Sequence, residues 1–227
     1  MNKIKMKITY LLLAASVLLL NSSCNSRQQP ESVPFDVGTA SRNKALADST
    51  PAASEFVCSD GWRVTGYYTP FESDFNSAER EKIKVENVGN LKFNKEFLLE
   101  IYNKQECERG GDCGEGWGKT KLGWYLGYYD DKWHKSQAPL DANGNPLSLN
   151  SIAVDRNQIP ANSKVTVSGI PSPFAERIYT ANDVGLSVLG KHVDIYCGEG
   201  TQAKQSMYDI TRNEEHEWVR VCFKKPD

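Results

Sequence analysis

Residues 182–194 read NDVGLSVLGKHVD, and this stretch places Gly185 and Gly190 between Asp183 and Asp194. Strand interiors disfavour both aspartate and glycine, so an ordinary strand would carry neither. Two interpretations are open from these residues alone. The stretch is either a plain turn between strands, or a backbone shaped so that the two carboxylates come together.

Short segments rich in Val, Ile, Tyr and Thr surround this stretch, and Gly, Pro, Asn or Ser bounds most of them. The pattern predicts a mainly β fold, a compact sheet or barrel, with strands in residues 62–71, 151–155, 164–170, 177–183, 191–198 and 217–223. One helix is predicted in FNKEFLLEIYNKQ, residues 93–105. There Asn94 caps the first turn, and Phe97 and Ile101 share one face.

The N-terminal residues predict export. Residues 1–23 combine early lysines, an apolar run too short to cross a bilayer comfortably and small residues before Cys24, which is typical of a signal peptide. The order resembles a bacterial lipoprotein signal, in which the cysteine is acylated, so Cys24 is the expected lipidation site. A free or disulfide-bonded Cys24 is the alternative. Polar residues 24–54 are expected to form a flexible tether, and residues 55–227 a single domain.

Charge and residue spacing exclude several partners. The chain has 27 basic and 29 acidic residues, so no charge excess favours nucleic acid. The acidic residues lack EF-hand spacing, and histidines and cysteines are not spaced as zinc ligands. We therefore expect no metal, no other cofactor and no nucleic acid partner.

An exported protein meets an oxidising compartment, so its cysteines are first interpreted as disulfide candidates. Cys58 and Cys222 lie near the two ends of the predicted domain, and Cys107 and Cys113 flank a glycine-rich loop. Each of these is a candidate pair. Cys197 is left over, and a small buried residue is favoured there over a redox role.

Three aspartates recur at predicted strand ends: Asp155 in AVDRNQIP, Asp183 in ANDVG and Asp194 in GKHVDIYCGEG. Together with the upstream TGYYTPFE, these segments resemble the 3D domain, the family named for its three aspartates. They resemble more closely the barrel of the murein lytic transglycosylase A proteins. The resemblance covers residues 65–70 and 152–200 and leaves an insertion of about residues 76–150 unmatched. Leu186 and Leu189 depart from the family pattern.

The resemblance implies a double-psi β-barrel that binds peptidoglycan, with Asp194 as the catalytic acid and base. Such an enzyme is a lyase. It cleaves the β-1,4 bond between N-acetylmuramic acid and N-acetylglucosamine, and the muramoyl 6-hydroxyl attacks its own anomeric carbon to give a 1,6-anhydro product. One carboxylate suffices for this reaction. If Asp183 lies near Asp194, mutual repulsion and partial burial would hold one proton on the pair at neutral pH.

The substrate-binding residues that the resemblance implies are Tyr67, Tyr68, Thr69, Asp155, Gly185 and Gly190. Strand alternation allows only one of the two tyrosines to face the groove. Asp155 has a second interpretation, since an aspartate at a strand end also holds turns through side-chain to backbone hydrogen bonds. His192 is interpreted as a surface residue or a satisfied donor, because families of this kind do not use it as a catalyst.

The insertion is rich in aromatic residues from Trp117 to Trp133, which suit either sugar rings or a packed core. The expected protein is a lipid-anchored, disulfide-bonded enzyme of the cell envelope, placed in the outer membrane and facing the periplasm. Its partners are peptidoglycan glycan strands and the membrane. A non-catalytic, expansin-like lipoprotein that binds wall glycan is the alternative, since fold does not fix function.

Overall fold

The computed structural model describes residues 56–109, 116–211 and 219–226. The predicted signal peptide, the lipidation site at Cys24 and the tether at residues 24–54 lie outside the described residues. The predicted pair of Cys107 and Cys113 also falls on side chains outside them. Within the described ranges, no helix is long and apolar enough to cross a membrane.

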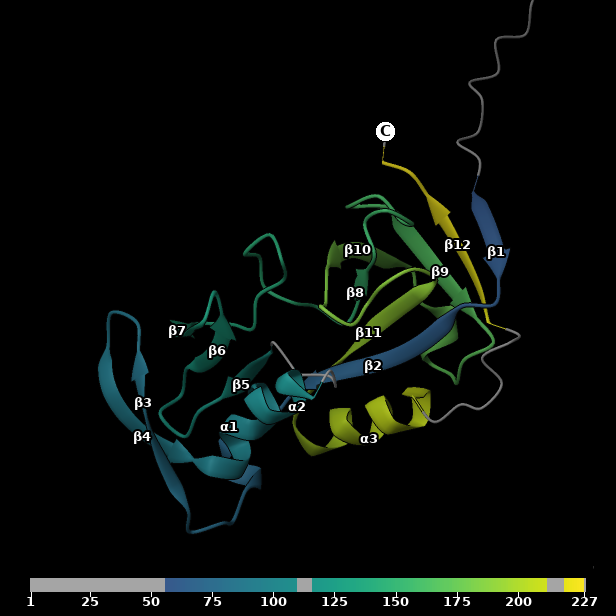
Figure 1. Cartoon of the computed structure of the whole chain (residues 1–227). Coiled ribbons are helices and arrows are strands. Elements are labelled where there is room, and N and C mark those ends of the chain that lie inside the picture. Colours follow the sequence, from purple (N-terminus) through teal and green to yellow (C-terminus); the bar gives the residue numbers. More distant parts are fainter. Residues whose placement is uncertain (1–55, 110–115, 212–218, 227) are drawn as a thin grey trace, which may run out of the picture. The chain divides into compact units, whose positions relative to one another are not determined.

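The predicted mainly β fold is confirmed, and its main element is a curled sheet that we call the large sheet (Figure 1). In the described part of the chain this sheet contains seven strands. Their spatial order is β1 (Val57–Asp60), β12 (Arg220–Lys224), β9 (Lys164–Ser168), β10 (Tyr179–Asp183), β8 (Ser151–Val154), β11 (His192–Glu199) and β2 (Arg63–Thr69). The pairs β2–β11 and β8–β10 are parallel, and the other neighbours are antiparallel.

Strand alternation gives the large sheet two different faces. One face carries the apolar core, which includes Val64, Ile152, Val193 and Ile195. Helix α3 (Gly200–Thr211) packs on this face along β2 and β11 (Figure 1). Residues between the core positions therefore point to the opposite face, which we call the polar face.

The packing of α3 depends on a close approach at Gly66. A Cβ atom there would lie 2.8 Å from Cys197 Sγ and 3.1 Å from the Cα of Met207 in α3. Cys197 is buried, as predicted, and burial raises the pKa of its thiol to about 12. The thiol is therefore protonated and fills space between strand and helix.

The disulfide between Cys58 and Cys222 confirms one predicted pair. The two cysteines are direct register partners in β1 and β12, so the bond joins the first and last described strands. Cross-linking residues so far apart in sequence restricts the unfolded chain more than a local bridge would.

The segment predicted as an insertion contains a second sheet, which we call the small sheet. In the described residues it has five strands, in the order β4 (Gly89–Asn94), β3 (Arg80–Val85), β7 (Lys132–Ser136), β6 (Tyr125–Tyr129) and β5 (Trp117–Lys119). Helix α1 (Lys95–Ile101) covers one face with Phe97 and Ile101, and Gly118 lies beneath these two side chains.

The predicted helix is shorter than its sequence pattern indicates. Asn94 caps α1 as expected, since its side chain accepts a hydrogen bond from the Phe97 N–H at 3.2 Å. The helix ends at Ile101 because Tyr102 is extended and its ring stacks on Tyr128 at a centroid distance of 3.7 Å. A separate helix, α2 (Lys104–Glu108), follows.

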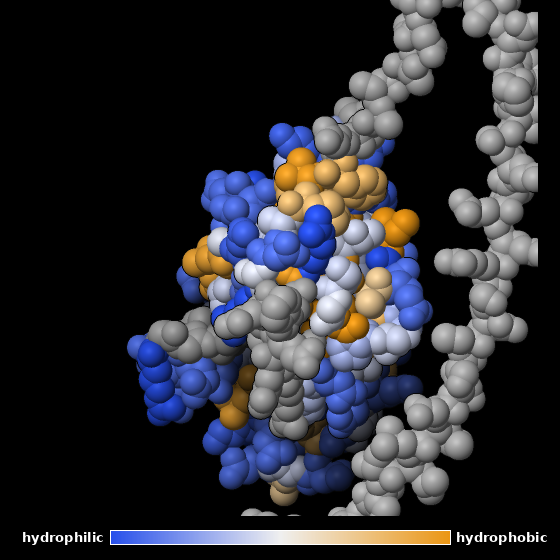
Figure 2. All heavy atoms as spheres, turned by 90° about the vertical axis from the view of Figure 1, so that its right-hand side faces the viewer, coloured by the Kyte–Doolittle hydropathy of each residue, from blue (hydrophilic) through white to orange (hydrophobic). Residues whose placement is uncertain are grey.

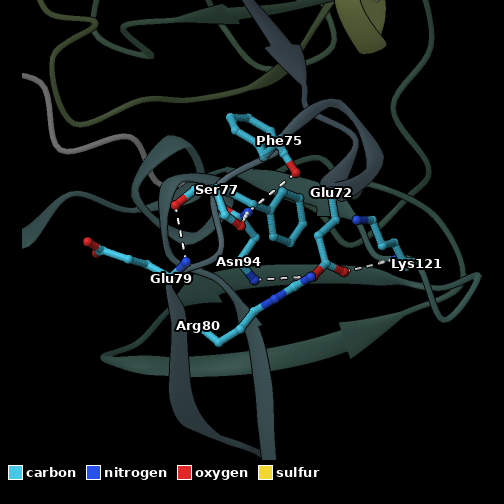
Figure 3. Close-up of polar contacts among 8 residues, drawn as sticks. Glu72, Phe75, Ser77, Glu79, Arg80, Asn94 and Lys121 are labelled. Carbon is cyan, nitrogen blue, oxygen red and sulfur yellow. Dashed lines mark hydrogen bonds and ion pairs between the residues drawn. The ribbon is translucent and has the colours of Figure 1, made fainter.

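Glu72, in the 3-10 helix Glu72–Asp74, connects several parts of this region (Figure 3). Glu72 is 3% exposed, and its carboxylate accepts hydrogen bonds from Arg80 Nη1 at 2.7 Å, the Asn94 N–H at 3.2 Å and the Lys121 N–H at 3.0 Å. Charge-assisted bonds of this kind offset the cost of burying a carboxylate. Glu72 therefore fixes β3, the start of α1 and the β5–β6 turn to one another.

Several aromatic side chains of the insertion pack in the apolar core between the small sheet and α1. Trp124 is buried edge-on against Phe93, and Tyr128 and Trp133 pack against the same cluster. Tyr129 stays partly exposed. On the face that Figure 2 presents, apolar side chains form separate patches among hydrophilic ones, a pattern that is normal for a protein surface.

Candidate active site

The strand register places Asp183 and Asp194 in one row across the polar face. Asp183 of β10 and Asp194 of β11 are each the register partner of Ala153 in β8, from opposite sides. On the far side of Asp194, its partner in β2 is Thr65. Two strand spacings separate the two aspartates, which corresponds to roughly 10 Å between their Cα atoms. The polar face therefore carries two carboxylates in one row.

Asp183 is held by donors from three directions. The Tyr67 hydroxyl donates to Oδ2 at 2.6 Å, and the N–H groups of Val184 and Ala142 donate to Oδ1 at 3.0 Å each. Burial raises the pKa of Asp183, and these three hydrogen bonds oppose the rise. The neighbouring carboxylate that raises it is Asp141, whereas the sequence predicts repulsion from Asp194.

A loop that the sequence analysis missed supplies one of these donors. Asp141 Oδ1 accepts hydrogen bonds from the N–H groups of Asn143 and Asn145, and Oδ2 accepts from Asn182 Nδ2 at 2.9 Å. The side-chain turn at Asp141 thereby presents the Ala142 N–H to Asp183. The sequence DANGN carries the signal for such a turn, because aspartate commonly bonds the backbone two residues further on.

Tyr67 contacts Asp183 and is within electrostatic range of Asp194. The Tyr67 hydroxyl donates to Asp183. Burial is the largest cause that raises the pKa of Tyr67 well above its ordinary value, and the charges of Asp183 and Asp194 raise it further. Its ring packs on Tyr196 at 5.2 Å, and the Tyr196 hydroxyl lies 2.9 Å from Thr69 Oγ1. Tyr67 is therefore a protonated donor at neutral pH, and Thr69 supports the aromatic pair from a buried position.

Tyr68 points to the other face, in agreement with the alternation argument. Its hydroxyl donates to Glu100 at 2.5 Å, and Lys204 of α3 pairs with the same carboxylate at 2.8 Å. Of the two predicted tyrosines, the structure brings Tyr67 to the aspartates and leaves Tyr68 with α1 and α3.

Asp194 is bonded to Thr65, a residue that the sequence analysis did not select. Thr65 Oγ1 lies 2.8 Å from Asp194 Oδ1 and 2.8 Å from His192 Nε2, within hydrogen-bond distance of both. His192 is 5% exposed, so its interpretation as a surface residue is wrong, and the alternative of a bonded ring holds. The parallel pairing of β2 with β11 creates this contact, and the local sequence gives no sign of it.

Asp155 is hydrogen-bonded to Gly190, which lies in the loop between β10 and β11. The Asp155 carboxylate accepts the N–H of Asn157 and the N–H of Gly190, each at 2.8 Å, and these bonds lower its pKa. Gly190 has φ of +66°, which glycine adopts without strain. The structure therefore places Asp155 in a turn-holding position, the second of the two interpretations that its sequence context allows.

The rest of the loop forms a tight turn whose apolar side chains are exposed. The Val188 N–H bonds the Gly185 carbonyl at 3.0 Å, and Leu186 and Leu189 are 67% and 70% exposed. Residues 182–194 are thus a strand end, a turn and the start of the next strand. This organisation reconciles both initial interpretations, because the turn itself returns the chain so that Asp194 aligns with Asp183.

The polar face of the large sheet meets the small sheet at Glu199. The Tyr125 hydroxyl of β6 contacts both carboxylate oxygens of Glu199 at 2.9 and 3.1 Å. A pocket of about 260 Å³ is lined by Phe71, Ser73, Lys119, Thr120 and Lys121. The described residues contain no cluster of His, Cys, Asp or Glu suited to hold a metal ion.

Comparison with known proteins agrees with this fold. Residues 150–213 match the family model of the 3D domain. The structure of Escherichia coli MltA with bound chitohexaose is similar, with a TM-score of 0.50 and 14% identity, over 73% of this chain and 72% of that chain. A membrane-bound lytic murein transglycosylase from Agrobacterium tumefaciens gives a TM-score of 0.49 and 11% identity, over 74% and 75% of the two chains.

No curated protein matches the chain in sequence. The chain contains a 3D domain, and its fold is that of the MltA lytic transglycosylases, as the sequence motifs predict. The identities are low, so the likeness concerns the fold, and the reaction has to be argued from this chain's own residues.

Proposed function

We propose that this protein is a peptidoglycan lytic transglycosylase in which Asp194 is the catalytic acid and base. The observation that carries the proposal is the single row of Asp183, Ala153 and Asp194 on the polar face, with a hydroxyl group in hydrogen-bond contact with each carboxyl group. The MltA-like fold supports it, because the similar Escherichia coli protein is a lytic transglycosylase with a bound chitohexaose.

The chemistry needs one group that first gives and then takes a proton. Protonated Asp194 donates to the glycosidic oxygen as the bond to the anomeric carbon of N-acetylmuramic acid breaks, which avoids an alkoxide leaving group. The 6-hydroxyl of the same sugar then attacks the anomeric carbon, and its proton passes to Asp194. The product is a 1,6-anhydro sugar, no water is consumed, and Asp194 returns to its starting state.

Asp183 and Tyr67 act as positioning residues in this scheme. The three donors on Asp183 fix its orientation. In its ionised form Asp183 would stabilise the positive charge of an oxocarbenium-like transition state. Tyr67 donates a hydrogen bond to Asp183, and the charge of Asp194 raises its pKa, so it interacts with both carboxyl groups. Thr69, Gly185 and Gly190 shape the surrounding backbone, and Tyr68 and Asp155 act structurally.

The cellular setting forms part of the proposal. A lipid anchor on Cys24 would hold the protein in the outer membrane facing the periplasm, and the tether at residues 24–54 would let the domain reach the wall. The partners are then peptidoglycan strands and the membrane, without nucleic acid, metal or other cofactor.

The test is a digest of purified peptidoglycan by the full chain in detergent, with muropeptides analysed by mass. We expect 1,6-anhydro products, and we expect Asp194→Asn to reduce their rate by about 10²-fold or more, because an amide cannot exchange the proton. Wall binding and thermal stability should stay unchanged. A wild-type digest without anhydro products, combined with retained wall binding, would instead establish the expansin-like glycan-binding function.

A further inference from the structure

His192 is a buried titratable group that the proposed reaction does not yet use. Its Nδ1 lies 3.0 Å from the Ser187 carbonyl oxygen, and its Nε2 lies 2.8 Å from Thr65 Oγ1. Thr65 Oγ1 is in turn 2.8 Å from Asp194 Oδ1. An imidazole, a hydroxyl and a carboxyl group therefore form one continuous hydrogen-bonded chain.

Counting protons restricts the states of this chain. The Ser187 carbonyl only accepts, so Nδ1 of His192 must carry a hydrogen for this contact to be a hydrogen bond. The Thr65 hydroxyl has one proton and can donate to only one neighbour. If it donates to Asp194, then Nε2 must donate to Thr65, and His192 is an imidazolium.

The other arrangement is neutral. If Asp194 carries a proton and donates it to Thr65 Oγ1, then the Thr65 hydroxyl donates to Nε2, and His192 is a neutral imidazole. The two arrangements contain the same number of protons and differ by moving one proton across each of two hydrogen bonds. The neutral arrangement avoids an imidazolium at His192, which is 5% exposed, and burial penalises such a charge.

We propose that His192 is a positioning residue that, through Thr65, keeps the catalytic proton on Asp194 before the reaction. This inference rests on the proposed function for its catalytic meaning. When glycan binds, the Asp194 proton turns from Thr65 Oγ1 to the glycosidic oxygen, and after its transfer the Thr65 hydroxyl rotates to donate to the new carboxylate. When the muramoyl 6-hydroxyl returns the proton to Asp194, the Thr65 hydroxyl turns back to Nε2 and the chain is restored.

The strands explain why these groups meet. His192 and Asp194 are two positions apart in β11 and so lie on the same face, and Thr65 is the register partner of Asp194 in β2. Tyr67 of β2 and Cys197 of β11 are within electrostatic range of Asp194, whose charge raises the pKa of each. Lys191 Nζ bonds the Asp60 carbonyl, Asp155 bonds the Gly190 N–H, and Arg63, the register partner of His192, is exposed.

The first test needs no substrate. Nitrogen-15 NMR of the full-length protein in detergent should find His192 neutral at pH 7, with hydrogen on Nδ1 and none on Nε2. A hydrogen on Nε2 at this pH would overturn the proposal. Because this measurement does not involve glycan, it separates the proton arrangement from the lytic activity. A correct tautomer in a protein without anhydro products would refute the proposed function alone.

The second test is the pH profile of anhydro-product formation. In His192→Phe the neutral arrangement loses one hydrogen bond, from Thr65 to Nε2. In Thr65→Val it loses two, whereas the ionised carboxylate loses one, so in both variants the neutral arrangement is weakened by one hydrogen bond relative to the ionised form. The limb where activity falls with rising pH should therefore move down by about one pH unit. His192→Gln offers an acceptor oxygen to Thr65 and should restore most of the profile.

The variants also test the link between the two residues. The double variant should shift the profile no further than either single variant, because both remove the same interaction. His134→Phe is the matched control, since that ring stacks on Tyr129 in the small sheet and should leave the profile unchanged. Additive shifts, or profiles identical to the wild type, would contradict a shared chain.

Discussion

Glu72 in the 3-10 helix before the small sheet and Asp194 in the large sheet are both carboxylates in hydrogen-bonded networks, and their partners differ in kind. Glu72 is bonded to a guanidinium and to two backbone N–H groups. These donors keep their protons, so Glu72 is an anion that holds three segments together. Asp194 is bonded to a hydroxyl, which can donate or accept, and behind it lies an imidazole.

The difference indicates how to recognise a reactive acid within one protein. A carboxylate surrounded by permanent donors is stabilised in one protonation state, whereas one facing a hydroxyl is stabilised in either state. Asp183 lies between these extremes, since it has two backbone donors like Glu72 and a phenol donor from Tyr67. Substitutions at these acids and their donors therefore test the comparison.

The largest effect on stability is expected for Glu72→Ala. This change leaves two buried N–H groups and Arg80 without their acceptor, and it should lower the free energy of unfolding by about 3 kcal/mol. The anhydro-product rate per folded molecule should stay close to that of the wild type. Chemical denaturation and digest rates measure the two quantities.

The control for this variant is Glu79→Ala. Glu79 pairs with Lys95 at 3.1 Å, but both side chains are largely exposed. Exposed pairs contribute little, so the change should be below about 0.5 kcal/mol. Equal losses for Glu72→Ala and Glu79→Ala would mean that the Glu72 network does not stabilise the fold as described.

A smaller loss is expected for Tyr67→Phe, which removes the phenol donor from Asp183. Loss of a hydrogen bond to a buried carboxylate should cost about 2 kcal/mol. Because this bond opposes the rise in the pKa of Asp183, its removal should raise that pKa further. Tyr68→Phe is the matched control, since it removes a hydroxyl from the adjacent residue on the other face and should leave the digest rate unchanged.

Asp183→Asn should change stability by less than about 1 kcal/mol at pH 7, since an amide resembles the neutral acid in shape. The folded-state pKa of Asp183 is raised, so the folded state favours the protonated form. The stability that this group contributes is therefore present at acid pH and is lost as pH rises through the folded-state pKa. The variant should lack this dependence and should show a shifted pH profile of activity.

Unfolding curves between pH 4 and pH 7 provide the measurement for Asp183→Asn. The wild type should lose stability relative to the variant as pH increases over this range. Parallel curves would show that burial does not act on Asp183 in the way described, and an unaltered activity profile would remove Asp183 from the site.

The sequence was sufficient for elements whose signals are local. The strands around Val64, Ile152 and Ile195 follow from their β-branched residues and turn boundaries, and the cap at Asn94 follows from its position before an apolar helical face. The motif around Asp183 and Asp194 identified the 3D domain. In each case the residues that determine the element are neighbours in sequence.

The elements that the sequence analysis missed depend on distant contacts. Helix α3 has few buried residues, among them Ala203 and Ile210, so its apolar periodicity is weak and only packing on β2 and β11 reveals it. Thr65 and His192 are unremarkable until β2 pairs with β11. Glu72 is similar, since its three donors come from separate segments of the chain.

The smallest effect on stability is expected for a substitution of Asp155. Like Glu72, Asp155 accepts hydrogen bonds from two backbone N–H groups, but it is more accessible to solvent. Its pKa lies below the ordinary value of 3.8, chiefly because of the Gly190 N–H. The stability it contributes is therefore present above the unfolded-state pKa and is lost as pH falls through the folded-state pKa. Asp155→Asn should be less stable than the wild type at pH 7, and the difference should shrink as pH falls below 3.8. Denaturation curves at pH 7 and below pH 3.8 measure this difference in stability, with Glu81→Gln as an exposed control. A difference independent of pH would mean that the charge of Asp155 does not hold the turn.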